Sequence, residues 1–203
     1  MMPFDLVEPA SLREALGLLD PDDPAVRAIA GGTALMLMMK SGFFRPTRLV
    51  SLRALGEDFT GIALSPAGAL RAGAMVRLAE LERAPEVGAA FPVIAQTLRT
   101  HSNPRVRNVA TIGGNLAHAD PHMDLPPVLI ALGAEIEVAG PAGRRRIPVD
   151  GLVSGYYETV LRGDELIAAL IVPPQPRRRA LYVKCTTRAA DDWPALGIAL
   201  SLE

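Results

Sequence analysis

Two pairs of adjacent glycines constrain this chain more than any other feature of its sequence. Segment 29–33 reads IAGGT, and segment 110–115, about eighty residues later, reads ATIGGN. Each pair stands with a threonine at the end of a β-like run. Glycine lets the backbone take a positive φ and lets another group approach with no Cβ in the way. Both segments are therefore predicted to be tight turns.

Such turns can bind anions through their backbone. Successive exposed N–H groups form a concave anion site, and a helix predicted to start after the first turn adds its partial positive charge. Two facing turns would hold the two phosphates of a dinucleotide, with hydroxyl donors from Thr33 and Thr111 and an amide from Asn115. A glycine pair is usually only a turn, and neither segment matches the G-x-G-x-x-G fingerprint. The residues alone leave a dinucleotide site and two plain turns as open alternatives.

Hydrophobic periodicity and breaker residues predict a mixed succession of helices and strands. Helices are expected over residues 11–19, 33–40, 78–100 (broken at Pro85 and Pro92) and 125–132. Strands are expected over residues 26–30, 48–52, 62–64, 69–75, 135–139, 144–149, 165–172, 180–187 and 194–202. Segment 101–124, rich in Gly, Asn, Pro and His, is expected to be a loop. The first part of the chain reads as a small βαβ unit.

Composition excludes several classes of protein. The 203 residues carry 21 basic and 22 acidic side chains, so nothing indicates a nucleic-acid surface or an anionic membrane. A lone cysteine, Cys185, is expected to be buried, and it cannot build a disulfide framework or an all-cysteine iron–sulfur site. The N-terminus has no secretory pattern, and the apolar run 28–39 is too short to span a bilayer. We expect a cytoplasmic protein without membrane insertion.

Two longer segments carry a family resemblance. Segment 30–35 (AGGTAL), followed by Met39 and Lys40, and segment 105–127 (RVRNVATIGGNLAHADPHMDLPP) resemble the flavin motifs of the FAD-binding medium subunits of molybdenum hydroxylases, such as carbon monoxide dehydrogenase and xanthine dehydrogenase. The resemblance continues through 164–167 and 182–184. It implies an α+β fold, a p-cresol-methylhydroxylase-type FAD-binding domain of two α/β lobes. The implied bounds are 1–174 for that domain (lobes about 1–54 and 55–174) and 175–203 for a truncated C-terminal domain.

The resemblance also implies a set of site residues around an elongated FAD whose pyrophosphate meets both glycine segments. Asp124 matches a carboxylate that accepts hydrogen bonds from the cofactor, and Ile167 matches an apolar contact. Lys184 matches a lysine near the isoalloxazine, and His101 stands where a relative has an aromatic residue. The implied cofactor-binding residues are Ile29, Ala30, Gly31, Gly32, Thr33, Ala34, Leu35, His101, Thr111, Gly113, Gly114, Asn115, Asp124, Ile167 and Lys184.

Several of these residues have a plainer alternative. Asp124 would cap a helix starting at Leu125, and Lys184 would serve solubility on an edge strand. His118 and His122, with neighbouring aspartates, fit no compact zinc signature, so no metal site is predicted. The arginine runs 144–146 and 177–179 read as solvated charges. Alanine at position 34 departs from the acidic or polar residue common in the family.

The function implied is that of an oxidoreductase subunit that transfers electrons. A large molybdenum-cofactor subunit would act on the substrate, and a small [2Fe-2S] subunit would pass electrons to this FAD, which delivers them to an acceptor. The chain would supply no catalytic side chain of its own, because the isoalloxazine does the chemistry. The alternatives are a non-catalytic assembly module that has lost flavin and a stand-alone flavin oxidase.

Overall fold

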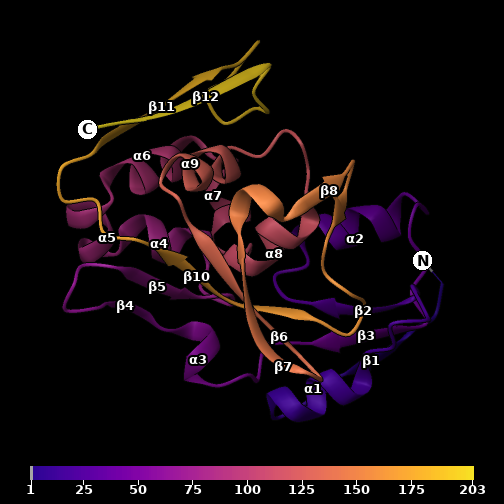
Figure 1. Ribbon diagram of the computed structural model, residues 1–203. Coiled ribbons are helices and arrows are strands. Elements are labelled where there is room, and N and C mark those ends of the chain that lie inside the picture. The colour runs from indigo at the N-terminus through magenta and orange to yellow at the C-terminus, as the bar shows by residue number, and fades with distance from the viewer. Residues whose placement is uncertain (1) are drawn as a thin grey trace.

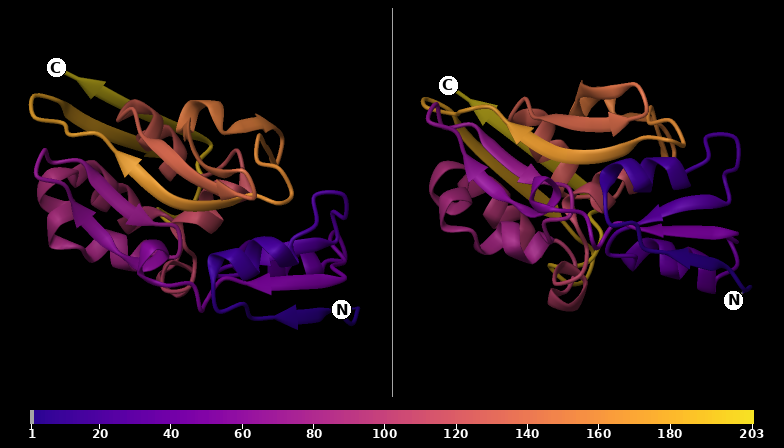
Figure 2. Two further views of the ribbon diagram at one scale, coloured as in Figure 1. Left: turned by 60° about the horizontal axis from the view of Figure 1, so that its bottom comes forward. Right: turned by 90° about the horizontal axis from the view of Figure 1, so that it is seen from below.

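The computed structural model describes residues 2–203 and begins with a small α/β lobe. Three parallel strands, β1 (Asp5–Val7), β2 (Val26–Ile29) and β3 (Arg48–Ser51), pair in the order β1–β3–β2. Helices α1 (Leu12–Leu18) and α2 (Thr33–Lys40) connect them. The predicted βαβ unit is confirmed, and Figure 2 shows this lobe beside the larger remainder of the chain.

The second lobe is built on a five-stranded antiparallel sheet in the order β4–β5–β10–β6–β7. Its central strand reads LIAALIV and is buried at six of seven positions, as a strand covered on both faces must be. The strands of this sheet are β4 (Ile62–Leu64), β5 (Leu70–Gly73), β6 (Glu135–Gly140), β7 (Gly143–Pro148) and β10 (Leu166–Val172).

Short helices fill the space between this sheet and the C-terminal hairpin (Figure 1). The predicted helix 78–100 is divided into three at Pro85 and Pro92, because proline fits only the first turn of a helix. The helices of this lobe are α3 (Glu57–Thr60), α4 (Leu78–Arg83), α5 (Pro85–Ala90), α6 (Pro92–Thr100), α7 (Pro104–Arg107), α8 (Ile112–His118) and α9 (Leu125–Ala131). Leu78, Ile94 and Leu129 of these helices are fully buried in one core with the sheet.

The loop predicted over 101–124 is wrong in part, because it contains α7 and α8. Asn103 caps α7 by accepting the Val106 N–H, and Thr111 caps α8 by accepting the Gly114 N–H. Glycine has a low helix propensity, so the Gly113–Gly114 pair argued against a helix and α8 was not predicted. Short elements were also missed, namely β1, α3, the 3₁₀ turn Val149–Gly151, β8 (Val153–Gly155) and β9 (Glu158–Thr159).

The chain described here closes with a separate two-stranded hairpin, β11 (Arg179–Cys185) and β12 (Leu196–Leu202), packed on α6 and α9 (Figure 1). Its two faces are inverted relative to a usual amphipathic strand. The half-buried inner face carries Ala180, Tyr182, Lys184, Gly197, Ala199 and Ser201. The exposed outer face carries Leu181, Val183, Cys185, Leu196, Ile198, Leu200 and Leu202. The expectation that Cys185 is buried is therefore wrong.

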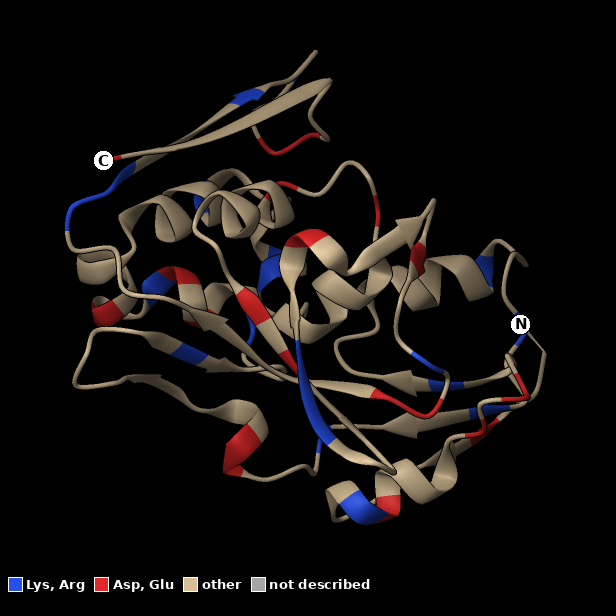
Figure 3. Cartoon of the chain, in the orientation of Figure 1, with Lys and Arg blue, Asp and Glu red and all other residues tan. Residues whose placement is uncertain are grey.

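Charged side chains are concentrated in pairs on the sheet. The run 144–146 on β7, blue in Figure 3, pairs with acidic side chains. Arg144 contacts Glu137, and Arg145 makes two hydrogen bonds of 2.9 and 2.8 Å to Glu165. The hydrogen bond from Arg145, opposed by burial, holds the pKa of Glu165 below its usual value.

Within residues 2–203, no helix is both long and apolar enough to cross a membrane.

Candidate functional site

The first glycine segment forms the junction between β2 and α2. Gly32 is the N-cap residue of α2 and has φ of +70°, so the predicted left-handed turn is confirmed at this position. Gly31 has a different role. A Cβ built there would lie 2.9 Å from the carbonyl carbon of Val109 and 3.0 Å from Cα of Ala110, closer than real Cβ atoms come. Gly31 thus lets the first segment lie directly against the second.

Five consecutive backbone N–H groups of the first segment, residues 31–35, have no acceptor among the described residues. The first turn of a helix leaves its N–H groups without intrahelical partners, and here no capping side chain replaces them. The N-terminus of α2 therefore offers a row of donors with the positive end of a helix dipole behind it. This is a cradle for an anion.

The second glycine segment is not the positive-φ turn that the sequence predicted. Gly113 and Gly114 lie in the first turn of α8, and neither has positive φ. Gly113 is required for packing, since a Cβ there would lie 2.6 Å from Cβ of Ala74. The four N–H groups of residues 112–115 all have protein acceptors, including Ala74 O at 2.8 Å and the Thr111 hydroxyl at 3.1 Å. This segment forms a wall beside the cradle and does not contribute free N–H donors.

A second cluster of predicted residues gathers around Asp124. Its Oδ2 accepts from Nδ1 of His101 at 3.0 Å and from Nζ of Lys184 at 3.0 Å, and its Oδ1 accepts from the hydroxyl of Tyr182 at 2.7 Å. Lys184 also donates to the Thr100 carbonyl at 2.8 Å. The side chains of Asp124 and Lys184 are 3% and 7% exposed. This cluster ties the hairpin to the second lobe.

The plainer alternatives for these two residues are both wrong. Asp124 has helical backbone angles, and its side chain makes no hydrogen bond to the first turn of α9, so it is not a helix cap. Lys184 lies on an edge strand but points inward, so it does not serve solubility. Whether either residue contacts a cofactor remains a prediction.

Hydrogen bonding sets the charge state of the cluster. Burial works to raise the pKa of Asp124, but the hydrogen bonds from His101, Tyr182 and Lys184 and the Lys184 charge outweigh it and lower that pKa. Burial and the adjacent carboxylate raise the pKa of Tyr182. Asp124 is therefore an anion and Tyr182 a neutral donor at neutral pH.

His101 connects this cluster to the second glycine segment. With Nδ1–H donating to Asp124, Nε2 is left to accept from Nδ2 of Asn115 at 3.2 Å. The predicted amide donor of Asn115 is thus already engaged. Its Oδ1 is buried and has no partner among the described residues. A buried acceptor without a donor is costly, and it indicates that the site is one donor short.

The other predicted site residues divide into those that the fold brings together and one that stands apart. Residues 29–35 and Thr111 to Asn115 are brought together, as Gly31 and Gly114 show; a Cβ on Gly114 would lie 3.9 Å from Cβ of Ala30. Ile167 does not join the polar cluster and packs in the core of the sheet on β10. Its neighbour Ala168 accepts from Ala74, against which Gly113 packs.

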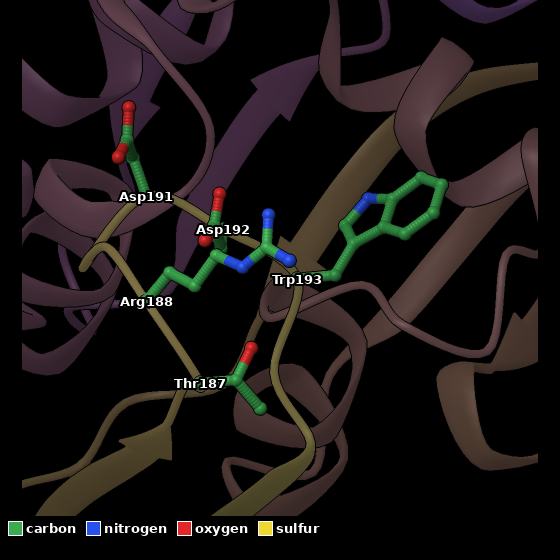
Figure 4. Close-up of a pocket in the computed structure, with 5 residues that line it drawn as sticks. All are labelled: Thr187, Arg188, Asp191, Asp192 and Trp193. Carbon is green, nitrogen blue, oxygen red and sulfur yellow. The ribbon is translucent and has the colours of Figure 1, made fainter.

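A separate aromatic cluster lies near the hairpin loop. The backbone N–H of His122 donates to Asp120, and its ring stacks on Trp193 with ring centroids 5.3 Å apart. The ring of His118 lies against Tyr157. The described part of the chain holds no group of three or more His, Cys, Asp or Glu side chains placed to bind a metal ion. An open pocket of about 370 Å³ beside Trp193 lies within the loop itself (Figure 4) and is lined by Thr187, Arg188, Asp191, Asp192 and Trp193.

Sequence reasoning missed two residues of the Asp124 cluster. Tyr182 carries the shortest hydrogen bond to Asp124, and Gly197 on the facing strand makes room for its ring. A Cβ on Gly197 would lie 3.1 Å from two ring carbons of Tyr182 and closer still to its hydroxyl. The two-residue repeat of a strand puts Tyr182 on the face of Lys184, and that was the available signal.

Comparisons with known proteins show the family to which the chain belongs. A family model described as the FAD binding domain in molybdopterin dehydrogenase matches residues 2–175. The carbon monoxide dehydrogenase medium chain of Hydrogenophaga pseudoflava is 33% identical over 197 residues, which are 97% of this chain and 68% of that relative. The putative xanthine dehydrogenase FAD-binding subunit XdhB of Escherichia coli is 30% identical, and the match covers 94% of this chain and 65% of that relative.

Solved structures show the same fold. Carbon monoxide dehydrogenase from Hydrogenophaga pseudoflava superposes with a TM-score of 0.93 at 34% identity, covering 99% of this chain and 70% of that chain. Quinoline 2-oxidoreductase from Pseudomonas putida 86 gives a TM-score of 0.90 at 31% identity, covering 98% and 68%. The predicted mixed α+β fold is thereby confirmed. This chain belongs to the family of FAD-binding medium subunits of molybdopterin dehydrogenases, which are oxidoreductases.

Proposed function

We propose that this chain binds one FAD and carries electrons as the flavin subunit of a molybdenum hydroxylase. The observation that carries the proposal is the row of free N–H groups at residues 31–35, set against the wall formed by α8. A diphosphate needs such donors, and the dipole of α2 adds to them. The residues present therefore fit FAD.

Each side chain has a limited task in this proposal. The N–H groups of residues 31–35 hold the diphosphate, and Thr111, Gly113 and Gly114 form the facing wall. Lys184 places a buried cation that favours negative charge on a reduced flavin. Bound FAD supplies the redox chemistry, and the protein supplies binding, orientation and charge.

Partners follow from the family. Relatives named medium chains imply companion chains in one assembly. In this proposal a large molybdenum-cofactor subunit acts on the substrate, and a small [2Fe-2S] subunit delivers electrons to FAD for transfer to an acceptor. The domain bounds of 1–174 and 175–203 are part of the proposal. The family match through residue 175 and the separate sheet of the hairpin support them.

One observation favours the assembly module as the second candidate. All N–H groups of residues 112–115 have protein acceptors, so only one of the two glycine segments offers backbone donors. Alanine at position 34 adds no polar side chain. A module of this kind would keep the fold and its partners without flavin.

Titration of the purified chain with FAD separates the two candidates. We expect one FAD to bind per chain, measured by the quenching of flavin fluorescence. Riboflavin, which lacks the diphosphate, should bind much more weakly. Protein that folds and takes up no FAD would overturn the proposal in favour of the assembly module.

A single proline substitution tests whether the backbone N–H groups of residues 31–35 bind the diphosphate. Ala34→Pro removes one N–H at the second position of α2, where proline is tolerated, as Pro126 is at the second position of α9. Loss of one hydrogen bond to a charged group predicts a dissociation constant for FAD raised about tenfold or more. Arg13→Pro makes the same change at the second position of α1 and should leave FAD affinity unchanged. Equal affinities for both variants would contradict the proposed cradle.

A further inference from the structure

A continuous chain of hydrogen bonds joins the second glycine segment to the C-terminal hairpin. It runs from Asn115 through His101 to Asp124, with distances of 3.2 and 3.0 Å, and from Asp124 to Tyr182 and Lys184 with distances of 2.7 and 3.0 Å. All these links are buried or half-buried. This chain of hydrogen bonds runs from α8, which forms the wall of the proposed FAD cradle, to strand β11 of the two-stranded hairpin.

These polar links are part of what attaches the hairpin to the rest of the fold. β11 and β12 pair with each other and with no strand of the five-stranded sheet. The inner face offers small side chains such as Ala180, Ala199 and Gly197, while the large aliphatic side chains point outward. Ala180, Tyr182 and Ala199 pack against the core, and the hydroxyl of Tyr182 and the Nζ of Lys184 add specific polar contacts.

We propose that docking of the β11–β12 hairpin regulates FAD binding through His101, which acts as a positioning residue. This inference rests on the proposed function, since it concerns the same site. With the hairpin docked, Asp124 is held by Tyr182 and Lys184, and it fixes the His101 ring with Nδ1–H toward itself. The ring then holds Asn115 on the inner side of α8.

Release of the hairpin has the opposite effect. Asp124 loses two of its three donors, and the His101 ring loses a fixed acceptor. The Asn115 amide then keeps only its 3.0 Å contact with Sδ of Met123 as a fixed partner. The docked form thus binds FAD more tightly. Because linkage is reciprocal, bound FAD must in turn hold the hairpin in its docked form.

A double-mutant cycle on FAD affinity tests the coupling. Tyr182→Phe removes one donor to Asp124, and His101→Phe keeps an aromatic ring while removing both nitrogens. Each single variant should raise the dissociation constant for FAD by about fivefold or more, the lower range of allosteric coupling. In the His101→Phe background, Tyr182→Phe should have no further effect, because the path is already cut.

Two further variants make the cycle specific. Val183→Thr, on the outer face between Tyr182 and Lys184, preserves shape and should leave FAD affinity unchanged. Gly197→Ala displaces the Tyr182 ring without removing a polar group and should reproduce Tyr182→Phe in both backgrounds. It serves the same purpose when Tyr182→Phe does not fold.

Hydrogen exchange provides an independent readout that a purely structural role would not move. FAD should slow exchange of the β11 and β12 amides in the wild-type chain, and the slowing should be clearly smaller in His101→Phe. Additive effects in the cycle, or hairpin amides that ignore FAD, would overturn the coupling while leaving FAD binding intact. A wild-type chain that binds no FAD would overturn both proposals.

Discussion

Lys184 on strand β11 and Asp124 at the N-terminal end of α9 form an ion pair, with Nζ and Oδ2 lying 3.0 Å apart and both side chains less than a tenth exposed. Such a pair is costly to break from one side only, because the remaining charge is left buried without a partner. The pair is also the point at which the hairpin and the predicted flavin site meet.

Replacing one partner of this pair should destabilise the protein strongly. Asp124→Asn is expected to lower the free energy of unfolding of the FAD-free chain by about 3 to 5 kcal/mol, the usual cost of a broken buried pair. Denaturation in urea measures this. Asp150→Asn, an exposed carboxylate on the 3₁₀ turn, is the matched control and should change stability by less than about 0.5 kcal/mol. A loss as small as that of the control would mean that the pair contributes nothing.

The same pair predicts a dependence on pH. Because the pKa of Asp124 is lowered on folding, its contribution to stability is present above the unfolded-state pKa of about 3.9 and is lost as pH falls through the folded value. The stability difference between wild type and Asp124→Asn should therefore shrink below about pH 4. Glu165, whose pKa is also lowered, is present in both proteins and cancels. A difference that stays constant between neutral and acidic pH would contradict the assignment.

Gly31 should be among the least replaceable glycines in the chain. Gly31→Ala places a Cβ against the Val109–Ala110 backbone, which cannot move aside as a side chain can, and should lower both the melting temperature and FAD affinity. Gly17→Ala, at the exposed penultimate position of α1 with nothing within 4 Å, should instead stabilise the chain by about 0.5 kcal/mol. Thermal melts of the two variants should move in opposite directions, and a neutral Gly31→Ala would refute the close approach.

Cys185 should react in the native state. It lies on the outer face of β11 and is exposed, so an aromatic disulfide reagent should modify one thiol per chain without denaturant. Cys185→Ser should abolish the reaction and leave the fold intact. A thiol that reacts only after unfolding would place it inside.

The sequence was most informative where local chemistry determines structure. The βαβ unit, the cap at Ser11 and the breaks at Pro85 and Pro92 all follow from neighbouring residues. Helix α8 was missed because its glycines are poor helix formers, whereas tertiary packing of Ile112 and Leu116 stabilises it. Local propensity cannot anticipate that compensation.

The site shows the same division. The glycine segments were recognised, but their reasons were partly misassigned, since Gly113 serves packing against Ala74 and not positive φ. The Asp124 cluster joins positions up to 84 residues apart, so its hydrogen bonds depend on the three-dimensional arrangement. Only the resemblance to a family brought His101, Asp124 and Lys184 forward together.

The inverted hairpin reverses the usual expectation for mutational tolerance. Along β11, polar replacements at Leu181 and Val183 should leave folding of this chain nearly unaffected, whereas charged replacements at Ala180 and Tyr182 should not be tolerated. A saturation scan scored for soluble yield would thus show tolerance rising where hydropathy is highest, the opposite of an ordinary half-buried strand.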